Sequence, residues 1–236
     1  MNVSDVRKPN GFTLVELLVV IVIIAALAAL SFTVLPRMMR KAKATEAMSN
    51  LRQFAPLLTT YATDHSMTLP AAEDNQVVVD GSSTPVPLKW TEVCLNQLFP
   101  DVAVAKFIDK AWWEQTKPFL RNPLFKGWTP ATPGYALNEM IAKNVDAARE
   151  NPLATDPLKI AVPLAAIPDP ARTPWIAPGL DFHYSLSAVS DATAFRTGGG
   201  KDLLSDGKFS VLFVDGHVES LTPAEYVSRK LYEFPR

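Results

Sequence analysis

The feature that most constrains this chain is a run of nineteen uncharged, mostly apolar residues, 17–35, close to the N-terminus. As a helix rising about 1.5 Å per residue, the run is roughly 28 Å long, close to the hydrocarbon thickness of a bilayer. A single carboxylate, Glu16, stands immediately before it. The run predicts a transmembrane helix, because an ordinary core helix rarely needs this length.

A secretory signal peptide is the first alternative interpretation of this segment. Arg7 and Lys8 precede the apolar run, and the small residues at 25–29 resemble those before a signal cleavage site. However, the run is too long for a signal peptide, and Glu16 lies on its apolar side. The transmembrane interpretation is therefore preferred.

The residues around Glu16 resemble the class III leader junction of type IV pilins and type II secretion pseudopilins. The matching residues are Gly11-Phe12-Thr13-Leu14-Val15-Glu16 followed by Leu17-Leu18-Val19-Val20-Ile21. The resemblance implies that a prepilin peptidase cuts between Gly11 and Phe12 and methylates the new amino group of Phe12. It also implies that residues 1–11 are a leader and that Glu16 is the glutamate on which assembly depends.

Glu16 also calls for a partner on physical grounds, since a carboxylate at membrane depth costs several kcal/mol unless it is paired or neutral. In the pilin resemblance that partner is the amino group of Phe12 on an adjacent subunit. The alternative is that Glu16 lies solvated in the headgroup layer and has no function.

The distribution of charge conflicts with the topology that the resemblance implies. The chain has 23 basic and 24 acidic residues, so no nucleic-acid partner is expected. Four basic residues follow the apolar run, Arg37, Arg40, Lys41 and Lys43, whereas only Arg7 and Lys8 precede it. The positive-inside rule would leave the C-terminal domain in the cytoplasm. The resemblance implies instead a single-pass protein of the bacterial inner membrane with a periplasmic head, and we follow the resemblance.

The helix is expected to continue beyond the membrane as an amphipathic segment, residues 36–64. Pro36 and Pro56 should each kink or loosen it, because proline removes an intrahelical hydrogen bond. The expected organisation is a leader (1–11), a transmembrane or fibre-core helix (12–35), this continuation, and a globular head (65–236). Apolar residues recur at helical spacing along one face of the continuation: Leu51, Phe54, Ala55, Leu58, Tyr61 and Ala62.

In the head, short helices are predicted at residues 91–99, 102–114 and 137–149, and a hairpin at residues 209–221. Asp215-Gly216 between two extended runs is typical of a tight hairpin turn. This region resembles a pilin-like subfamily with an H-x9-D-G motif, although its histidine is missing, and Phe195 and Arg196 stand ahead of the glycine tract. The predicted fold class is α+β, a long N-terminal transmembrane helix packed on an antiparallel β-sheet head with loop-rich insertions.

Two Asp-x-His pairs are the candidates for a metal site: Asp181-Phe182-His183 and Asp215-Gly216-His217. Asp202, Asp206 and Asp215 are weaker calcium candidates, and we interpret these aspartates mainly as turn formers. Cys94 is the only cysteine, which excludes an intramolecular disulfide, and it is expected to be buried. No catalytic motif is present, so we expect no enzyme, no cofactor and no metal.

The sequence therefore predicts a structural subunit of a type IV pilus-like or type II secretion pseudopilus fibre. Its expected partners are the prepilin peptidase, copies of itself or other pilin-like subunits, the inner-membrane assembly platform and the lipid bilayer. The alternative function is a membrane-anchored extracytoplasmic domain, binding or metal-dependent and hydrolytic, that uses a pilin-like leader for delivery.

Overall fold

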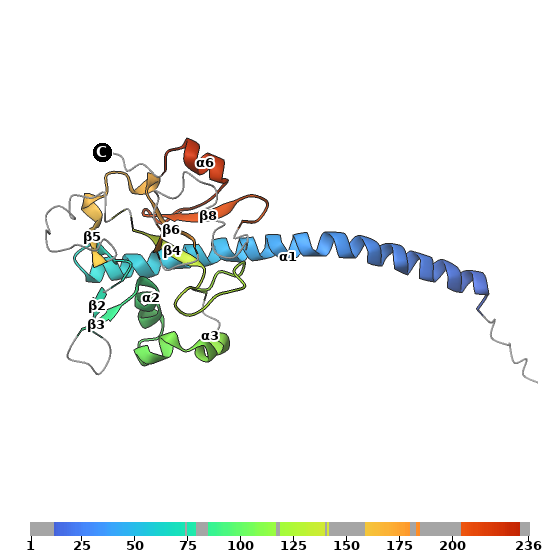
Figure 1. The fold of residues 1–236 in the computed structure, drawn as a ribbon, viewed down its shortest axis with the longest axis horizontal. Coiled ribbons are helices and arrows are strands. Elements are labelled where there is room, and N and C mark those ends of the chain that lie inside the picture. Colours follow the sequence, from blue (N-terminus) through green and yellow to red (C-terminus); the bar gives the residue numbers. More distant parts are fainter. Residues whose placement is uncertain are drawn as a thin grey trace, which may run out of the picture. The chain divides into compact units, whose positions relative to one another are not determined.

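The computed structural model describes residues 12–73, 75–78, 85–116, 119–139, 141, 159–179, 183–184 and 204–231. The chain divides into two compact units, Met1–Arg40 and Lys41–Arg236. The helix α1, Leu14–Asp64, contributes to both (Figure 1). Its residues from Lys41 onward thus belong with the head unit.

The helix α1 continues without interruption through Pro36 and Pro56, where the sequence predicted kinks or loosening. A proline removes only one donor from the helical ladder, and the turns on either side of Pro56 are held by buried Phe54 and Leu58. Local packing therefore maintains the helix across this proline.

The predicted buried face of the second half of α1 is confirmed. Leu51, Phe54 and Leu58 are completely buried, and Tyr61 and Ala62 are at most 5% exposed. Ala55 is half-buried at the border of this face. Leu51, Phe54, Leu58 and Ala62 pack in the main hydrophobic core of the head, whereas Tyr61 packs with Leu88 and Val93 in a smaller cluster.

The head contains a five-stranded sheet in the order β7-β4-β6-β8-β9. All neighbouring pairs are antiparallel except β4 and β7, which are parallel, so the predicted antiparallel sheet is confirmed apart from one edge strand. The strands are β4 (Tyr135–Asn138), β6 (Pro174–Pro178), β7 (His183–Tyr184), β8 (Phe209–Phe213) and β9 (Val218–Leu221).

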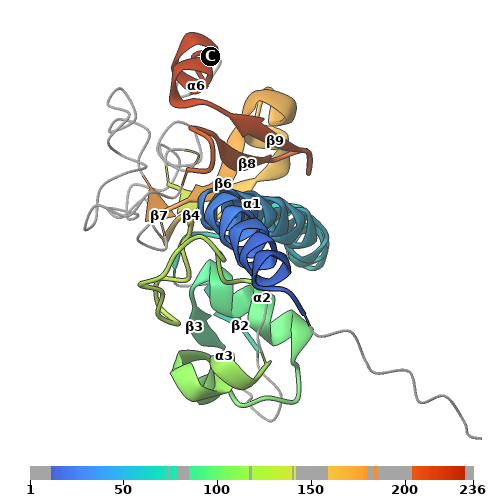
Figure 2. The same ribbon diagram turned by 90° about the vertical axis from the view of Figure 1, so that its right-hand side faces the viewer.

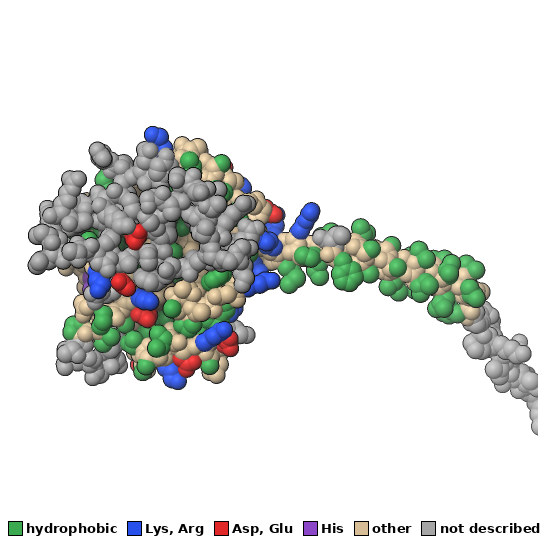
Figure 3. All heavy atoms as spheres, viewed as in Figure 1, with side chains coloured by type: hydrophobic (Ala, Val, Ile, Leu, Met, Phe, Trp, Pro, Cys, Tyr) green, Lys and Arg blue, Asp and Glu red, His purple; other side chains and the backbone are tan. Residues whose placement is uncertain are grey.

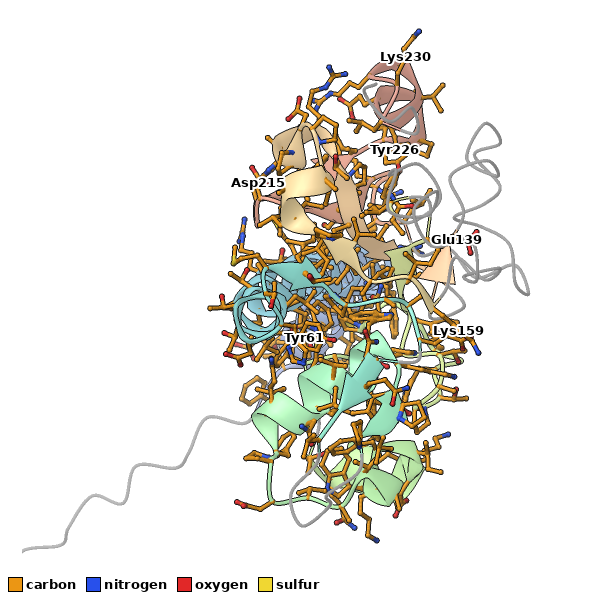
Figure 4. All side chains as sticks on the ribbon, turned by 90° about the vertical axis from the view of Figure 1, so that its left-hand side faces the viewer. Tyr61, Glu139, Lys159, Asp215, Tyr226 and Lys230 are labelled. Atoms are coloured by element: carbon orange, nitrogen blue, oxygen red, sulfur yellow. The ribbon has the colours of Figure 1, made fainter. Side chains whose placement is uncertain are left out.

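Figure 2 shows this sheet on one side of the head segment of α1. On the other side lie β2 (Asn75–Val77), β3 (Val86–Leu88), α2 (Trp90–Leu98) and α3 (Lys110–Thr116). The strand β8 alternates between two cores: Leu212 packs in the core around α1, whereas Val211 and Phe213 pack in a second core with Tyr226. Tyr226 belongs to α6 (Pro223–Ser228), and Figure 4 shows it at the end of the head opposite α2. The sheet is thus covered on both faces.

Two short sheets and several short helices complete the head. β1 (Thr68–Leu69) pairs with β5 (Val162–Pro163), and β2 (Asn75–Val77) pairs with β3 (Val86–Leu88). The helices are α2 (Trp90–Leu98), η1 (Val104–Ile108), α3 (Lys110–Thr116), η3 (Leu164–Ala166), η4 (Pro170–Arg172) and α6 (Pro223–Ser228).

The three helix predictions for the head have different outcomes. The helix at 91–99 is confirmed as α2, and the one at 102–114 is divided into η1 and α3. The prediction at 137–149 is wrong at its start, where Leu137 and Asn138 form the end of β4, and residues 142–149 lie outside the described residues. Pairing of Leu137 with Ile176 across the sheet outweighs local helix propensity here.

The predicted hairpin is confirmed, with a longer connection than expected. Four residues, 214–217, join β8 to β9 in place of the expected Asp215-Gly216 pair. Val214 is buried in the main core, and Asp215 Oδ1 accepts a hydrogen bond of 3.1 Å from the His217 amide. Gly216 supplies the positive φ of 92° that the turn requires.

The helix α6 is fixed by a capping box, which gives a first testable prediction. Glu225 accepts hydrogen bonds from the Thr222 amide (2.7 Å) and hydroxyl, and these lower the pKa of its carboxyl group. We expect Thr222→Ala to destabilise the head by about 1 kcal/mol, measured by chemical denaturation at neutral pH. Thr222→Ser keeps the hydroxyl and is the matched control.

The pH dependence of this cap has a defined sign. Because the folded-state pKa of Glu225 is depressed, its contribution is present above the unfolded pKa and is lost as pH falls through the folded value. The difference between wild type and Thr222→Ala should therefore narrow below about pH 4. A difference that widens on acidification would contradict this role of Glu225.

Candidate functional site at the start of the long helix

The residues singled out for processing and assembly lie where α1 begins. Phe12 precedes the helix and its side chain is 83% exposed. Glu16 lies in the first turn of α1. Gly11 lies outside the described residues.

The carboxylate of Glu16 is bound by the residue that caps the helix, Thr13. One oxygen, Oε2, accepts hydrogen bonds of 2.8 Å from both the amide and the hydroxyl of Thr13. The Glu16 amide donates in return to Thr13 Oγ1 at 3.2 Å. This reciprocal pattern is a capping box, which satisfies amides that have no partner within the helix.

The capping box sets the position at which the helix starts. The first bond of the α-helical ladder, from the Leu17 amide to the Thr13 carbonyl, is 3.3 Å long. Phe12 therefore lies outside the helix, and its backbone takes no part in the helical hydrogen bonding. A peptidase needs its substrate in an extended form, so this boundary leaves the predicted cleavage position next to non-helical backbone.

Thr13 is the functional residue that the sequence analysis missed. The spacing Thr13-x-x-Glu16 ahead of an apolar run is itself the signature of a capping box. The sequence analysis considers for Glu16 either an intermolecular partner or solvation in the headgroup layer, and not this bond within the chain. In this structure the carboxylate also has an intramolecular role.

The N-terminal part of α1 exposes its apolar side chains on all sides. Figure 3 shows these side chains along α1 before the basic residues that follow them. Within the described residues, α1 is the helix long and apolar enough to cross a membrane, and its most apolar stretch has no part buried in the protein. The large apolar side chains described here are 45% or more exposed, including Leu17, Ile21, Leu27 and Phe32.

Comparison with known proteins identifies the same segment. Residues 6–32 match the family described as the prokaryotic N-terminal methylation motif. No match was found among curated proteins or among solved structures. The matched residues include Gly11, Phe12 and Glu16, and the motif supports a type IV pilin-like precursor that is processed by prepilin peptidase and anchored in the membrane.

The resemblance to the H-x9-D-G subfamily is not confirmed. The spacing in that motif places its histidine ten residues before Asp215, where this chain has Ser205. His217 follows the Asp-Gly pair instead, and its Nδ1 lies 2.6 Å from Asp215 Oδ1. The His217 ring also stacks on Phe213 at 4.3 Å, so this region is organised as a turn.

The other candidate ligands are dispersed. No group of three or more metal-binding side chains occurs in the part of the chain that the structure describes. Asp181 and Asp202 lie outside the described residues, and of His183 only the backbone is described. Cys94 is completely buried, as predicted, and burial raises the pKa of its thiol, which therefore stays protonated at neutral pH.

Proposed function

We propose that this protein is a structural subunit of a type IV pilus-like or type II secretion pseudopilus fibre. The observation that carries the proposal is the N-terminal part of α1, which exposes an apolar surface on all sides and has one carboxylate at its start. Such a surface needs an apolar environment, first lipid and then the packed helices of other subunits. Repeated contacts of this kind that do not close into a ring produce a helical filament.

The proposed processing step precedes assembly. Prepilin peptidase cuts between Gly11 and Phe12 and methylates the amino group of Phe12. The new amino group then lies one residue before Thr13 and the capping box. On joining the fibre, Glu16 pairs with the Phe12 amino group of an adjacent subunit, which neutralises both charges in an apolar environment.

The proposed location is the bacterial inner membrane, with the leader in the cytoplasm, the head in the periplasm and the assembly platform as partner. The four basic residues after the apolar run oppose this orientation under the positive-inside rule. The motif at residues 6–32 favours it, because the peptidase must reach Gly11 from the cytoplasmic side. We further propose that the head is not an enzyme and acts as the outward-facing part of the fibre.

The role of Glu16 in assembly is tested with variants that separate its charge from its capping bonds. Glu16→Gln removes the charge, yet glutamine also completes a capping box. Thr13→Ala keeps the charge and removes the cap. We expect Glu16→Gln to be processed normally and to lower the sheared fibre fraction at least tenfold, since an unpaired buried charge costs about 3–5 kcal/mol.

Thr13→Ala is the matched control, because it loses only the cap, worth about 1 kcal/mol. It should retain most of its fibres. The comparison is made by quantifying the subunit in membrane and sheared fractions of the same cells. Fibre yields that are normal in Glu16→Gln and reduced in Thr13→Ala would assign Glu16 to helix capping alone and contradict its pairing with Phe12.

A further inference from the structure

The end of the head at which α1 stops has an exposed apolar surface. Met67 comes three residues after the end of α1, and its side chain is 48% exposed. Next to it runs a segment of nine apolar residues, 160–168, which contains β5 and η3 (Figure 1). We call Met67 and residues 160–168 the apolar tip. Four further residues of this tip are exposed: Ala161, Pro163, Ala165 and Pro168. Contiguous apolar surface of this kind is typical of a site where another molecule binds.

The backbone of the apolar tip is fixed around Met67. The Met67 amide donates a hydrogen bond of 2.7 Å to the Ala62 carbonyl, and the Met67 carbonyl accepts one of 2.8 Å from the Leu164 amide. Ser66 and Met67 have positive φ values of 55° and 59°, which residues other than glycine rarely adopt. The exposed Met67 side chain is therefore presented from a rigid turn, so little backbone freedom is lost when it binds a partner.

A cleft of about 210 Å³ lies at the other end of α1 within the same unit of the chain. One wall consists of the turns of α1 from Lys41 to Leu51, which lie roughly 20–35 Å before Asp64 along the helix axis. An apolar cavity of about 150 Å³ can hold benzene, so this cleft has room for a methionine side chain. Its apolar lining includes Ala44, Ala47, Met48, Leu51, Leu124 and Pro178.

The charges around the cleft favour an uncharged occupant. Lys41 and Lys208 line the cleft, but so does Asp206. Two further carboxylates act on the same region, because Glu225 interacts electrostatically with Lys208 and Glu46 with a tyrosine of the cleft wall. A small anion would be repelled by these carboxylates. An apolar side chain needs no opposite charge, and methionine adapts its shape to irregular apolar spaces.

We propose that the apolar tip of one subunit docks on the cleft of the next subunit, with Met67 inserted into the cleft. The inference rests on the proposed fibre and names one contact within it. The two surfaces match, because residues 160–168 carry no charge and the cleft has an apolar lining. They also lie at opposite ends of the head segment of α1, so the contact is heterologous. Such a contact can be repeated along an open filament, whereas a two-fold contact stops at a dimer.

The contact is tested with two cysteines in the full chain, Met67→Cys in the tip and Thr45→Cys at the exposed edge of the cleft. Fibres sheared from cells that contain prepilin peptidase are oxidised with copper phenanthroline and separated on a non-reducing gel. Cys94 is completely buried and should not react. We expect a ladder of disulfide-linked oligomers from the double variant and only monomers from each single variant. Met67→Cys/Gln115→Cys is the matched control, because Gln115 is exposed on α3 and does not line the cleft.

A single substitution tests how far the fibre depends on this contact. Aspartate tolerates positive φ, so Met67→Asp should keep the turn while it brings a charge into the apolar cleft. We expect at least tenfold less of this variant in the sheared fraction. Ile108→Asp is the control, since Ile108 is 68% exposed on η1 and outside both surfaces, and its fibre yield should not change.

The outcomes distinguish this contact from the fibre itself. Fibres of the cysteine variants that give no ladder would overturn the contact and leave the proposed function in place. Disulfide-linked dimers of Met67→Cys alone would indicate a two-fold contact between tips and would also overturn it. Equal losses of fibres in Met67→Asp and Ile108→Asp would show that the tip has no specific role. An absence of fibres in wild-type cells would contradict the proposed function, and the contact with it.

Discussion

Replacing Gly11 by alanine is expected to leave most of the protein as uncleaved precursor. The residues after the predicted cut are exposed or non-helical up to Thr13, so the peptidase has access to the bond from that side. At the cut itself, a methyl group added in a pocket shaped for glycine should slow cleavage by roughly 10- to 200-fold. The measurement is the intact mass and N-terminal sequence of the protein extracted from cells that contain prepilin peptidase.

Wild-type protein should lack residues 1–11 and carry one added methyl group on Phe12. Ser4→Ala, a small change elsewhere in the leader, should be processed like wild type. Glu16→Gln should also be processed, which separates the cleavage step from the assembly step. The same shortened mass and the same N-terminus in Gly11→Ala would count strongly against Gly11 as the cleavage residue.

The long helix could be predicted from sequence because its signals are local. The uncharged run predicts the membrane-spanning part of the helix. Leu51, Phe54 and Leu58, which are three and four residues apart, predict its buried face. Pro36 and Pro56 do not end the helix, since each removes only one donor from its hydrogen-bond ladder. The resemblance at Gly11-Phe12 and Glu16 was likewise readable, because cleavage motifs are contiguous.

The sheet of the head was less predictable, because its pairings join distant segments. Only the β8–β9 hairpin has a local turn signal, and it was found. The parallel pairing of β4 with β7 and the pairing of β1 with β5 depend on tertiary contacts. The error at Leu137 follows from the same cause, since its partner Ile176 is almost forty residues away.

In the candidate site, the sequence analysis identified the key residue but not all of its bonds. Glu16 was recognised from its charge, but its bonds to Thr13 require a view of the first turn as a capping unit. One carboxylate thus has two successive environments: Thr13 within the chain and, in the proposed fibre, an amino group from outside it.

The stability of the head should depend strongly on Phe54, which lies on α1 between the sheet and α2. Its ring is completely buried and makes edge-on contacts with Trp90 on one side, at 5.4 Å, and Tyr135 on the other, at 5.3 Å. A third ring, Phe119, lies 5.6 Å away. Removing the Phe54 ring would therefore leave a cavity bordered by aromatic groups that cannot easily collapse.

We expect Phe54→Ala to lower the free energy of unfolding by about 3–5 kcal/mol, a large share of the stability of a typical domain. Guanidinium unfolding of the full chain in detergent, followed by tryptophan fluorescence, measures this loss, because all five tryptophans lie in the head unit. Phe32→Ala is the matched control on the same helix, since Phe32 is 81% exposed and its loss should change stability by less than about 0.5 kcal/mol. Equal effects of the two substitutions would show that the head does not depend on α1 for its core.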